Sequence, residues 1–210
     1  MASRARLILA CAALAAGCHR KVAPPDPCLA IKAAIVELRD REGVLELALR
    51  PLDGSGAGTG IVCDAHGRAL GTLVRTADPP SLVLKNAAGD PEATLAFARG
   101  PGDSATLRYA HTSLRLYEDG SLMRVLDVAG VPLAQLSRDG ARAVIFDPAG
   151  RALAEAVRAD PEGDRRVIRA VDGTVRQLVA GTRDDRAAAA FALEGLPLVE
   201  RLLVARWLDQ

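Results

Sequence analysis

The histidines and serines are the first candidates for chemistry, because nucleophilic catalysis needs a serine or cysteine beside a base and an orienting acid. His66 lies in the tetrapeptide Asp64-Ala65-His66-Gly67, which is typical of a solvated turn, and His111 precedes Thr112 and Ser113. None of the serines lies in a nucleophile-elbow motif. The sequence therefore predicts no catalytic residue and a protein that is not an enzyme, and a hydrolase stays open as an alternative.

Acidic side chains and cysteines could hold a metal ion. Asp184-Asp185 and the group Asp160, Glu162 and Asp164 could bind calcium or act as acid–base pairs, although a helix cap and a turn are the favoured interpretations. Cys28 and Cys63 lie 35 residues apart, and no histidine has the spacing of a zinc site. We expect neither a metal nor a cofactor.

The glycine-rich segment from Gly54 to Gly60 could cradle a phosphate through its backbone N–H groups. A phosphate-binding loop is followed by a helix and usually contains a lysine. Here Ile61-Val62-Cys63 is typical of a strand. The segment is therefore predicted to be a flexible hairpin connection.

Charge and aromatic content argue against nucleic-acid binding. The formal net charge is +1, from 27 Lys and Arg against 26 Asp and Glu, so no strong field attracts a phosphate backbone. Aromatic residues make up only 3% of the chain, which leaves few rings on which bases could stack. A nucleic-acid partner is not expected.

The first seventeen residues have the pattern of a signal peptide. Arg4 and Arg6 precede an apolar run from Leu7 to Ala16, which is too short to span a bilayer. The run ends in Leu14-Ala15-Ala16-Gly17-Cys18, which resembles the lipobox of bacterial lipoproteins, with alanine at Ala15 where leucine is commonest. The resemblance implies cleavage before Cys18 and acylation of that cysteine. An ordinary secretory signal cut at Ala-x-Ala is the alternative.

Residues 18–27 contain Pro24, Pro25 and Pro27 and are predicted to form an extended tether between the lipid and the folded domain. The anchor implies the cell envelope, with the membrane as partner through the lipid and an envelope protein as a further candidate. His19 follows the lipid site where enteric inner-membrane lipoproteins have aspartate, which favours the periplasmic side of the outer membrane. In that oxidising compartment Cys28 and Cys63 form either a disulfide or two buried thiols.

Turn sequences divide the region after Ile31 into short strands, which predicts a mainly β fold. Between Asp119 and Gly150, bare Asp-Gly turns alternate with Asp-x-x-Gly turns at ten-residue intervals. One strand and one turn per ten residues is typical of an up-and-down antiparallel meander, so the two turn types are expected at opposite ends. The full Asp/Asn-x-x-Gly set begins at Asp40, Asp64, Asn86, Asp127, Asp147 and Asp160, and the bare Asp-Gly set at Asp119, Asp139 and Asp172.

The C-terminal region decides among a propeller, a solenoid and a barrel. Ala187 to Leu193 is apolar on every side, which indicates a helix surrounded by protein. Glu194-Gly195 interrupts it, and Pro197 suits a new first turn before Leu198 to Leu208. We therefore predict a single domain over 28–210, in which the meander closes into a barrel around a helix at about 184–208. A helix that fills the lumen would leave no ligand cavity. The alternative is that the C-terminal apolar region from Ala187 to Leu208 spans a membrane.

This pattern, ending in Leu196-Pro197-Leu198-Val199-Glu200-Arg201-Leu202-Leu203-Val204-Ala205, resembles the Tubby C-terminal, LURP-one and phospholipid-scramblase-like group. The resemblance implies a closed antiparallel barrel threaded by a hydrophobic helix. It carries no catalytic residue, and the lysine-rich phosphoinositide pocket of Tubby-like members has no counterpart among Lys21, Lys32 and Lys85.

The functional prediction is a lipid-anchored envelope lipoprotein with a non-catalytic binding or scaffolding β domain. An alternative is a YD/RHS-like repeat fragment, because Phe146-Asp147-Pro148-Ala149-Gly150-Arg151-Ala152-Leu153 resembles one unit of that family. Arginines such as Arg165-Arg166 are expected on the water side of strands, and Ala143, Ile145 and Leu153 on the apolar side.

Overall fold

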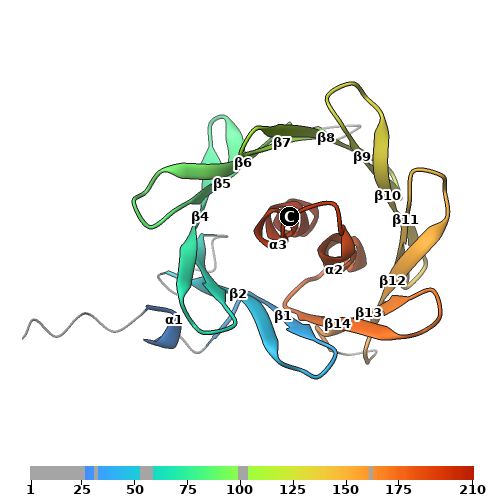
Figure 1. The fold of residues 1–210 in the computed structure, drawn as a ribbon, viewed down its shortest axis with the longest axis horizontal. Helices are drawn as coiled ribbons and strands as arrows, with labels where there is room; N and C mark the ends of the chain where they lie inside the picture. Colours follow the sequence, from blue (N-terminus) through green and yellow to red (C-terminus); the bar gives the residue numbers. More distant parts are fainter. Residues whose placement is uncertain (1–26, 31–32, 53–58, 99–103, 161–162) are drawn as a thin grey trace, which may run out of the picture.

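The structure is a computed structural model that describes residues 27–30, 33–52, 59–98, 104–160 and 163–210. Fourteen antiparallel strands follow one another around a closed barrel, in which β1 pairs with both β2 and β14. Figure 1 looks down the barrel axis and shows α2 (Asp185–Ala189) and α3 (Leu198–Leu208) inside the ring of strands. The strands are β1 (Val36–Asp40), β2 (Leu45–Pro51), β3 (Gly60–Asp64), β4 (Ala69–Ala77), β5 (Pro80–Lys85), β6 (Pro91–Phe97), β7 (Ser104–Tyr109), β8 (Thr112–Asp119), β9 (Leu122–Leu126), β10 (Pro132–Asp139), β11 (Arg142–Phe146), β12 (Ala152–Arg158), β13 (Arg166–Ala170) and β14 (Val175–Ala180).

The helices inside the barrel form one unit, which we call the plug: α2 (Asp185–Ala189), the 3-10 helix η1 (Ala190–Ala192) and α3 (Leu198–Leu208). Asp184 caps α2 by accepting a hydrogen bond from the backbone N–H of Arg186 at 2.7 Å. The plug runs down the lumen, reverses between Leu193 and Pro197, and returns along α3. The predicted barrel around a C-terminal helix is confirmed, and the interruption at Glu194-Gly195 marks the reversal.

Strand alternation explains why the plug is buried. Side chains such as Leu38, Leu95 and Leu136 point inward, are almost wholly inaccessible, and belong to the same apolar core as Phe191 and Leu203 of the plug. α2 lies closest to β10–β13, where several of the inward residues are alanines, and α3 approaches β5 and β6. Small residues on both surfaces let the alanine-rich helix α2 approach that wall closely.

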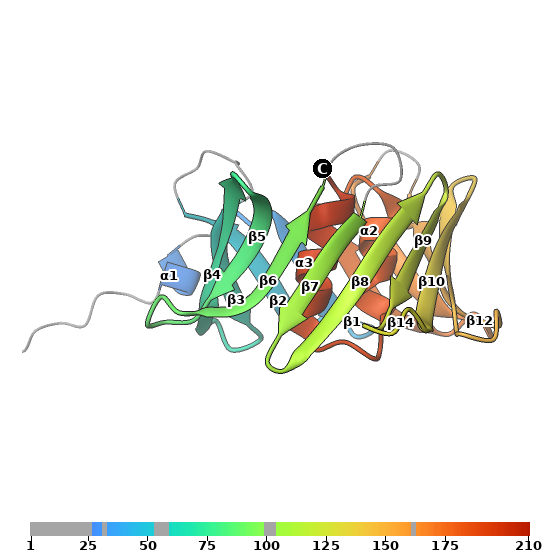
Figure 2. The same cartoon turned by 90° about the horizontal axis from the view of Figure 1, so that it is seen from above.

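The two ends of the barrel, called the upper and lower rims after their places in Figure 2, carry different turns. The lower rim consists of the turns at 41–44, 65–68, 86–90, 110–111, 127–131, 147–151 and 171–174. The upper rim carries Gly120-Ser121 and Gly140-Ala141, the entry of the plug and the C-terminus. Five of the six Asp/Asn-x-x-Gly turns lie at the lower rim, and the sixth, from Asp160, includes residues outside the described ranges. The bare Asp-Gly at Asp172 also lies at the lower rim, so the expected separation of the two turn types fails there. The alternation over 119–150 is confirmed.

Five of the six Asp/Asn-x-x-Gly turns, those from Asp40, Asp64, Asn86, Asp127 and Asp147, use the same hydrogen bonds. In the turn from Asp147, the Gly150 N–H donates to the Asp147 carbonyl at 2.9 Å, and the Arg151 N–H donates to Asp147 Oδ1 at 2.8 Å. Gly150 has φ +78°, a left-handed conformation that glycine adopts without a Cβ penalty. The backbone N–H of Arg151 and the guanidinium of Arg151 hold the pKa of Asp147 below its usual value.

Two expectations about side-chain direction are wrong. A bulge pairs Ile145 with Ala154 but Phe146 with Ala152, so Leu153 is skipped and is 43% exposed, whereas Ala154 and Ala156 face the core. Arg166 is 3% exposed and lies against the plug, because Asp185 supplies a buried partner at 3.1 Å. Its sequence context of alternating apolar residues gave no sign of that partner.

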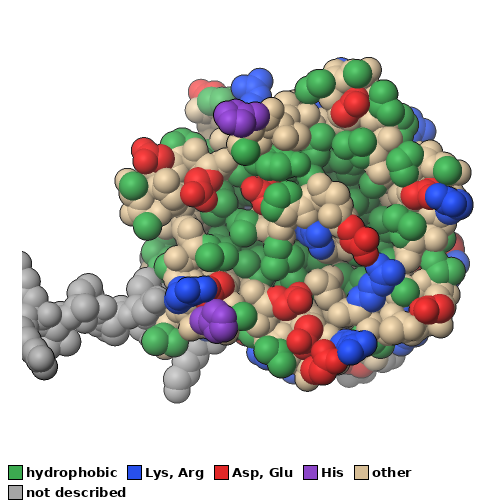
Figure 3. All heavy atoms as spheres, viewed as in Figure 1, with side chains coloured by type: hydrophobic (Ala, Val, Ile, Leu, Met, Phe, Trp, Pro, Cys, Tyr) green, Lys and Arg blue, Asp and Glu red, His purple; other side chains and the backbone are tan. Residues whose placement is uncertain are grey.

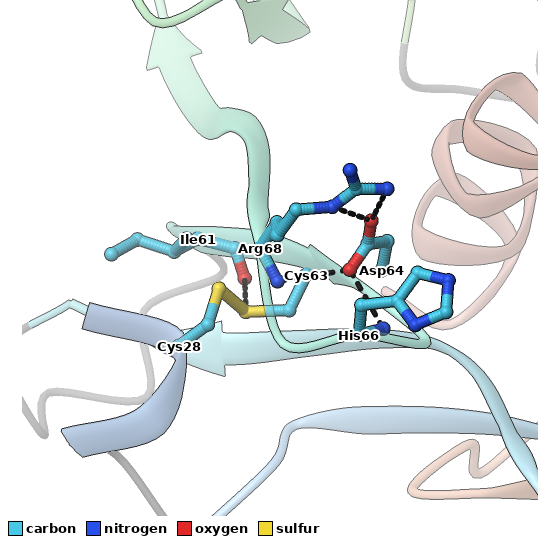
Figure 4. The surroundings of a disulfide bond; sticks show 6 residues. All are labelled: Cys28, Ile61, Cys63, Asp64, His66 and Arg68. Atoms are coloured by element: carbon cyan, nitrogen blue, oxygen red, sulfur yellow. Dashed lines mark hydrogen bonds and ion pairs between the residues drawn. A yellow bond between two sulfur atoms is a disulfide. The ribbon is translucent and has the colours of Figure 1, made fainter. Parts of the chain in front are cut away.

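The N-terminal helix α1 (Pro27–Ala30) lies outside the barrel against β3. Cys28 and Cys63 form a disulfide with a Cα–Cα distance of 5.9 Å. Figure 4 shows this bond beside the turn that contains Asp64 and His66. Cys28, Ala48, Ile61 and Cys63 form a small apolar cluster of their own on this outer face. Of the two alternatives for these cysteines, the structure has the disulfide.

Candidate binding pocket at the lower rim

Charged side chains at the upper rim fasten the plug to the wall. Asp185 of α2 pairs with Arg166 of β13, and Asp184 pairs with Arg138 of β10 at 2.7 Å. Arg186 reaches the other side, to Glu118 of β8 at 2.6 Å and to the carbonyl oxygen of Gly120 at 3.1 Å. The carboxylates of Asp184 and Asp185 are thus used in capping and in ion pairs, as the helix-cap interpretation predicts.

An open depression of about 880 Å³ lies beside this network and is lined by charged residues, including Arg138, Arg142, Arg158 and Asp185. Two of these arginines have carboxylate partners at 3.3 Å or less: Arg138 pairs with Asp184, and Arg142 pairs with Asp139 and Glu155. Arg158 lies 4.0 Å from Asp185, which also pairs with Arg166 of β13. Because opposite charges are already matched here, the depression has the character of a structural network more than of an anion site.

The histidines considered for catalysis lie in separate turns of the lower rim. The backbone N–H of His66 donates to Asp64 Oδ1 at 2.8 Å, which makes the histidine part of the β3–β4 turn. His111 follows Ala110 in the two-residue β7–β8 turn. Within the described ranges, no group of three or more His, Cys, Asp or Glu side chains is placed to hold a metal ion.

The reversal of the plug leaves an apolar pocket of about 220 Å³ at the lower rim. The barrel supplies one wall through β7–β12, and residues 192–196 of the plug supply the other. The expectation that a filled lumen leaves no ligand cavity is therefore wrong, because the reversal does not fill the barrel as the helices do. The lining residues are Tyr109, Thr112, Leu114, Val125, Leu133, Ala134, Ile145, Leu153, Ala192, Leu193, Glu194, Gly195 and Leu196.

Polar groups occur at the mouth of the pocket, while its depth is apolar. Leu114, Val125 and Ile145 are almost wholly buried, whereas Thr112 and Glu194 are exposed. An apolar cavity of roughly 150 Å³ holds a benzene-sized ligand. The pocket is therefore large enough for an aromatic ring or a short alkyl chain, with a hydroxyl or amide at the mouth.

Arg201 fixes the inner wall of the pocket. Its Nη1 donates to the carbonyl of Phe191 at 2.7 Å, and its Nε donates to the carbonyl of Leu196 at 2.7 Å. Burial lowers the pKa of Arg201, and the carboxylates of Glu194 and Glu46 oppose that shift. One half-buried guanidinium thus joins the end of η1 to the start of α3.

Sequence reasoning identified neither the pocket nor the role of Arg201. The only sequence signal was the interruption at Glu194-Gly195, which marks where the plug turns. The inward positions that complete the pocket come from strands as far apart in the chain as β7 and β12. Which of them meet depends on the register and closure of the barrel, and local patterns do not specify either.

Several predicted features fall outside the described residues. These are the signal peptide at 1–17, Cys18 with its tether up to residue 26, and most of the glycine-rich segment 54–60. Phe146–Leu153, the segment that resembles a YD/RHS unit, forms the end of β11, a lower-rim turn and the start of β12. Across the described ranges, none of the helices has the length and apolar character needed to cross a bilayer.

No protein-family model matches the chain, and no curated protein or solved structure matches it either.

Proposed function

We propose that this chain is a lipid-anchored lipoprotein of the bacterial envelope, held by Cys18, whose barrel is a non-catalytic binding module. The lower-rim pocket is its binding site, and the ligand is an apolar group the size of an aromatic ring or short alkyl chain. The observation that carries the proposal is the apolar pocket between β7–β12 and the plug reversal. Its buried lining contains no acid, base or nucleophile, which favours binding over catalysis.

Two further observations support the envelope location. The disulfide between Cys28 and Cys63 is the kind of bond that persists in an oxidising compartment. The five residues that end in Cys18 resemble a lipobox, and the small residues before the cysteine suit a signal peptidase. Membership of the Tubby-like group is also part of the proposal. The resemblance implies a barrel with an internal helix, and it does not indicate a ligand.

Titration of the full mature protein with 1-octanol, followed by calorimetry, tests the pocket. Ala134→Phe places a ring in the pocket and is expected to weaken octanol binding at least tenfold. Ala129→Phe, at an exposed position in the tip of the neighbouring turn, makes the same chemical change outside the pocket, and this variant is expected to bind octanol normally. Absence of octanol binding, or equal binding by the two variants, contradicts a binding role for the pocket.

Mass spectrometry of the mature protein tests the anchor separately. The expected N-terminus is an acylated Cys18. An unmodified N-terminus at another residue contradicts the lipoprotein assignment.

A further inference from the structure

Exposed aliphatic side chains are concentrated on one end of the barrel. Among the described residues, ten large hydrophobic side chains are exposed, and only Leu52 and Tyr117 lie away from the lower rim. The other eight follow the rim through five neighbouring connections, from the β9–β10 turn across the barrel closure to β3–β4. They are Leu29, Val44, Leu70, Val128, Val131, Leu133, Leu153 and Val171. Figure 3 shows this end of the barrel, with hydrophobic side chains around the rim and between wall and plug, and with charged and histidine side chains among them.

The polar groups of the same rim are largely satisfied within the turns. The carboxylates of Asp40, Asp64, Asp127 and Asp147 each accept a backbone N–H of their own turn at 2.8–2.9 Å. Two of these turns have small or apolar tips, Val128-Ala129 and Pro148-Ala149, whereas the other two tips are Arg41-Glu42 and Ala65-His66. A surface with exposed aliphatic groups and internally paired polar groups suits an interface where water is scarce.

The upper rim carries none of these eight exposed aliphatic side chains. It holds the ion pairs of Arg138, Arg166 and Arg186 and the charged depression beside them. The lower rim has exposed ion pairs as well, such as Arg41–Glu42 and Arg68–Asp64, so the two ends differ in their exposed aliphatic side chains and not in whether they carry charge. An uneven distribution of exposed aliphatic side chains is expected of a protein that meets an apolar surface with one end only.

The chain enters the domain beside the lower rim. Cys28 is bonded to Cys63, one residue before the β3–β4 turn, and Leu29 lies against Gly67 within that turn. Cys28 lies ten positions after Cys18, and a chain of that length spans at most roughly 35 Å when fully extended. An acyl group on Cys18 is thus tied to the lower rim by a short segment, and it brings that rim to the bilayer first.

We infer that the lower rim is a membrane-docking face, and that its partner is the surface of the phospholipid bilayer that holds the acyl chains of Cys18. This inference rests on the proposed function, because the anchor supplies the bilayer. The aliphatic ring lies at the boundary between headgroups and acyl chains, where binding strength scales with buried apolar area. The lower-rim pocket then opens toward the membrane, and lipid alkyl chains are its nearest ligands.

Quenching by brominated lipids tests the docking face. The full mature chain is reconstituted in vesicles of phosphatidylethanolamine and phosphatidylglycerol (3:1) whose acyl chains carry bromine. The reporters are Val128→Trp at the lower rim and Ser121→Trp at the upper rim, both exposed positions, and the sole native tryptophan, Trp207, is buried in both. We expect quenching of the Val128→Trp reporter to exceed that of the Ser121→Trp reporter at least twofold. Equal quenching, or none at either site, overturns the inference.

Replacing exposed aliphatic side chains with aspartate gives a second test, and it has a matched control. Val131→Asp with Val171→Asp places two carboxylates on the lower rim and is expected to abolish quenching of the Val128→Trp reporter. Leu52→Asp with Tyr117→Asp makes the same number of changes at exposed sites away from that rim and is expected to leave quenching intact. Dimerisation in detergent that the lower-rim pair disrupts, without bilayer quenching, would instead assign the face to a second copy and overturn the inference.

The outcomes separate the inference from the proposed function. An acylated Cys18 and normal octanol binding, together with unquenched Val128→Trp, leave the proposed function standing and reject the docking face. A mature protein without acylated Cys18 rejects the anchor by mass spectrometry before vesicles are used.

Discussion

Ala110 is the one non-glycine residue with positive φ among the residues that the structure describes, and it lies beside the pocket. Its φ is +47°, in the two-residue turn that joins Tyr109 to Thr112. A non-glycine residue in the left-handed region destabilises the folded state by roughly 1–2 kcal/mol. Glycine removes this strain, but it also increases the conformational entropy of the unfolded chain, so only part of the strain energy is gained as stability. We expect Ala110→Gly to raise the free energy of unfolding by about 0.5–1 kcal/mol, measured by urea denaturation.

Ala87 provides the control for that change. It is also exposed in a lower-rim turn, but its φ is not positive. Ala87→Gly is expected to lower stability by about 0.5 kcal/mol, because glycine only adds freedom to the unfolded chain. If Ala110→Gly and Ala87→Gly both raised the free energy of unfolding, backbone strain at Ala110 would not be the cause.

Asp147 makes stability depend on pH. Its pKa is lowered by the Arg151 N–H and guanidinium, so the folded state favours the ionised carboxylate. The stabilisation is complete above the unfolded pKa of about 4 and is lost as pH falls through the lower folded pKa. Asp147→Asn keeps an oxygen acceptor but no charge, so we expect it to be less stable than wild type at pH 7, with the difference shrinking as pH falls through the lowered folded-state pKa of Asp147.

Asn86 supplies the reciprocal test, because it occupies the same turn position without a charge and accepts the N–H of Asp90 at 2.9 Å. Asn86→Asp is expected to introduce an acid-sensitive contribution that wild type lacks at this turn. Urea denaturation of both variants between pH 7 and pH 2 measures the effect. A constant difference between Asp147→Asn and wild type across that range would contradict it.

At the scale of elements, the plug is held at its two ends by different interactions. At the upper rim, Arg166 and Asp185 form an ion pair with both side chains less than 10% exposed. Removing one partner of a buried pair strands the other charge and costs about 3–5 kcal/mol. We expect Arg166→Met to destabilise the protein by that amount, and Arg166→Met with Asp185→Leu to recover part of it. A double variant as unstable as the single one would show that the stranded carboxylate is not the cause.

At the lower rim, Arg201 holds the reversal. Arg201→Met leaves the carbonyls of Phe191 and Leu196 without their charged donor and is expected to cost about 1.5–3 kcal/mol. It is also expected to weaken octanol binding, because residues 192–196 form the inner wall of the pocket. Arg176→Met removes an exposed ion pair with Glu194 and should cost at most about 1 kcal/mol with unchanged octanol affinity. Equal effects of the two variants on octanol binding would contradict the role of Arg201.

At the scale of the whole molecule, local sequence patterns predict the strands and helices more accurately than they predict which residues contact one another. The ten-residue interval over 119–150 and the uniformly apolar segment 187–193 predicted the meander and the buried helix, because both signals are local. Arg166, Leu153 and the pocket were not predicted, since each depends on a bulge, a register or a partner distant in sequence. Strand number is equally non-local, because closure pairs β1 with β14 across the whole domain.

The plug is the centre of the only large core in the described residues, so the barrel should not survive without it. Phe191 is fully buried and shares one apolar cluster with inward side chains from all around the barrel wall. A chain that stops after Asp184 exposes those inward leucines to water, and we expect it to lose cooperative thermal unfolding and to bind a hydrophobic dye. Phe191→Ala is the milder change and should cost about 3–5 kcal/mol, whereas Val171→Ala at an exposed site should stay within about 0.5 kcal/mol. If the truncated chain unfolded cooperatively at the wild-type temperature, the strands would form a stable barrel without the plug. The plug would then not be required for the core.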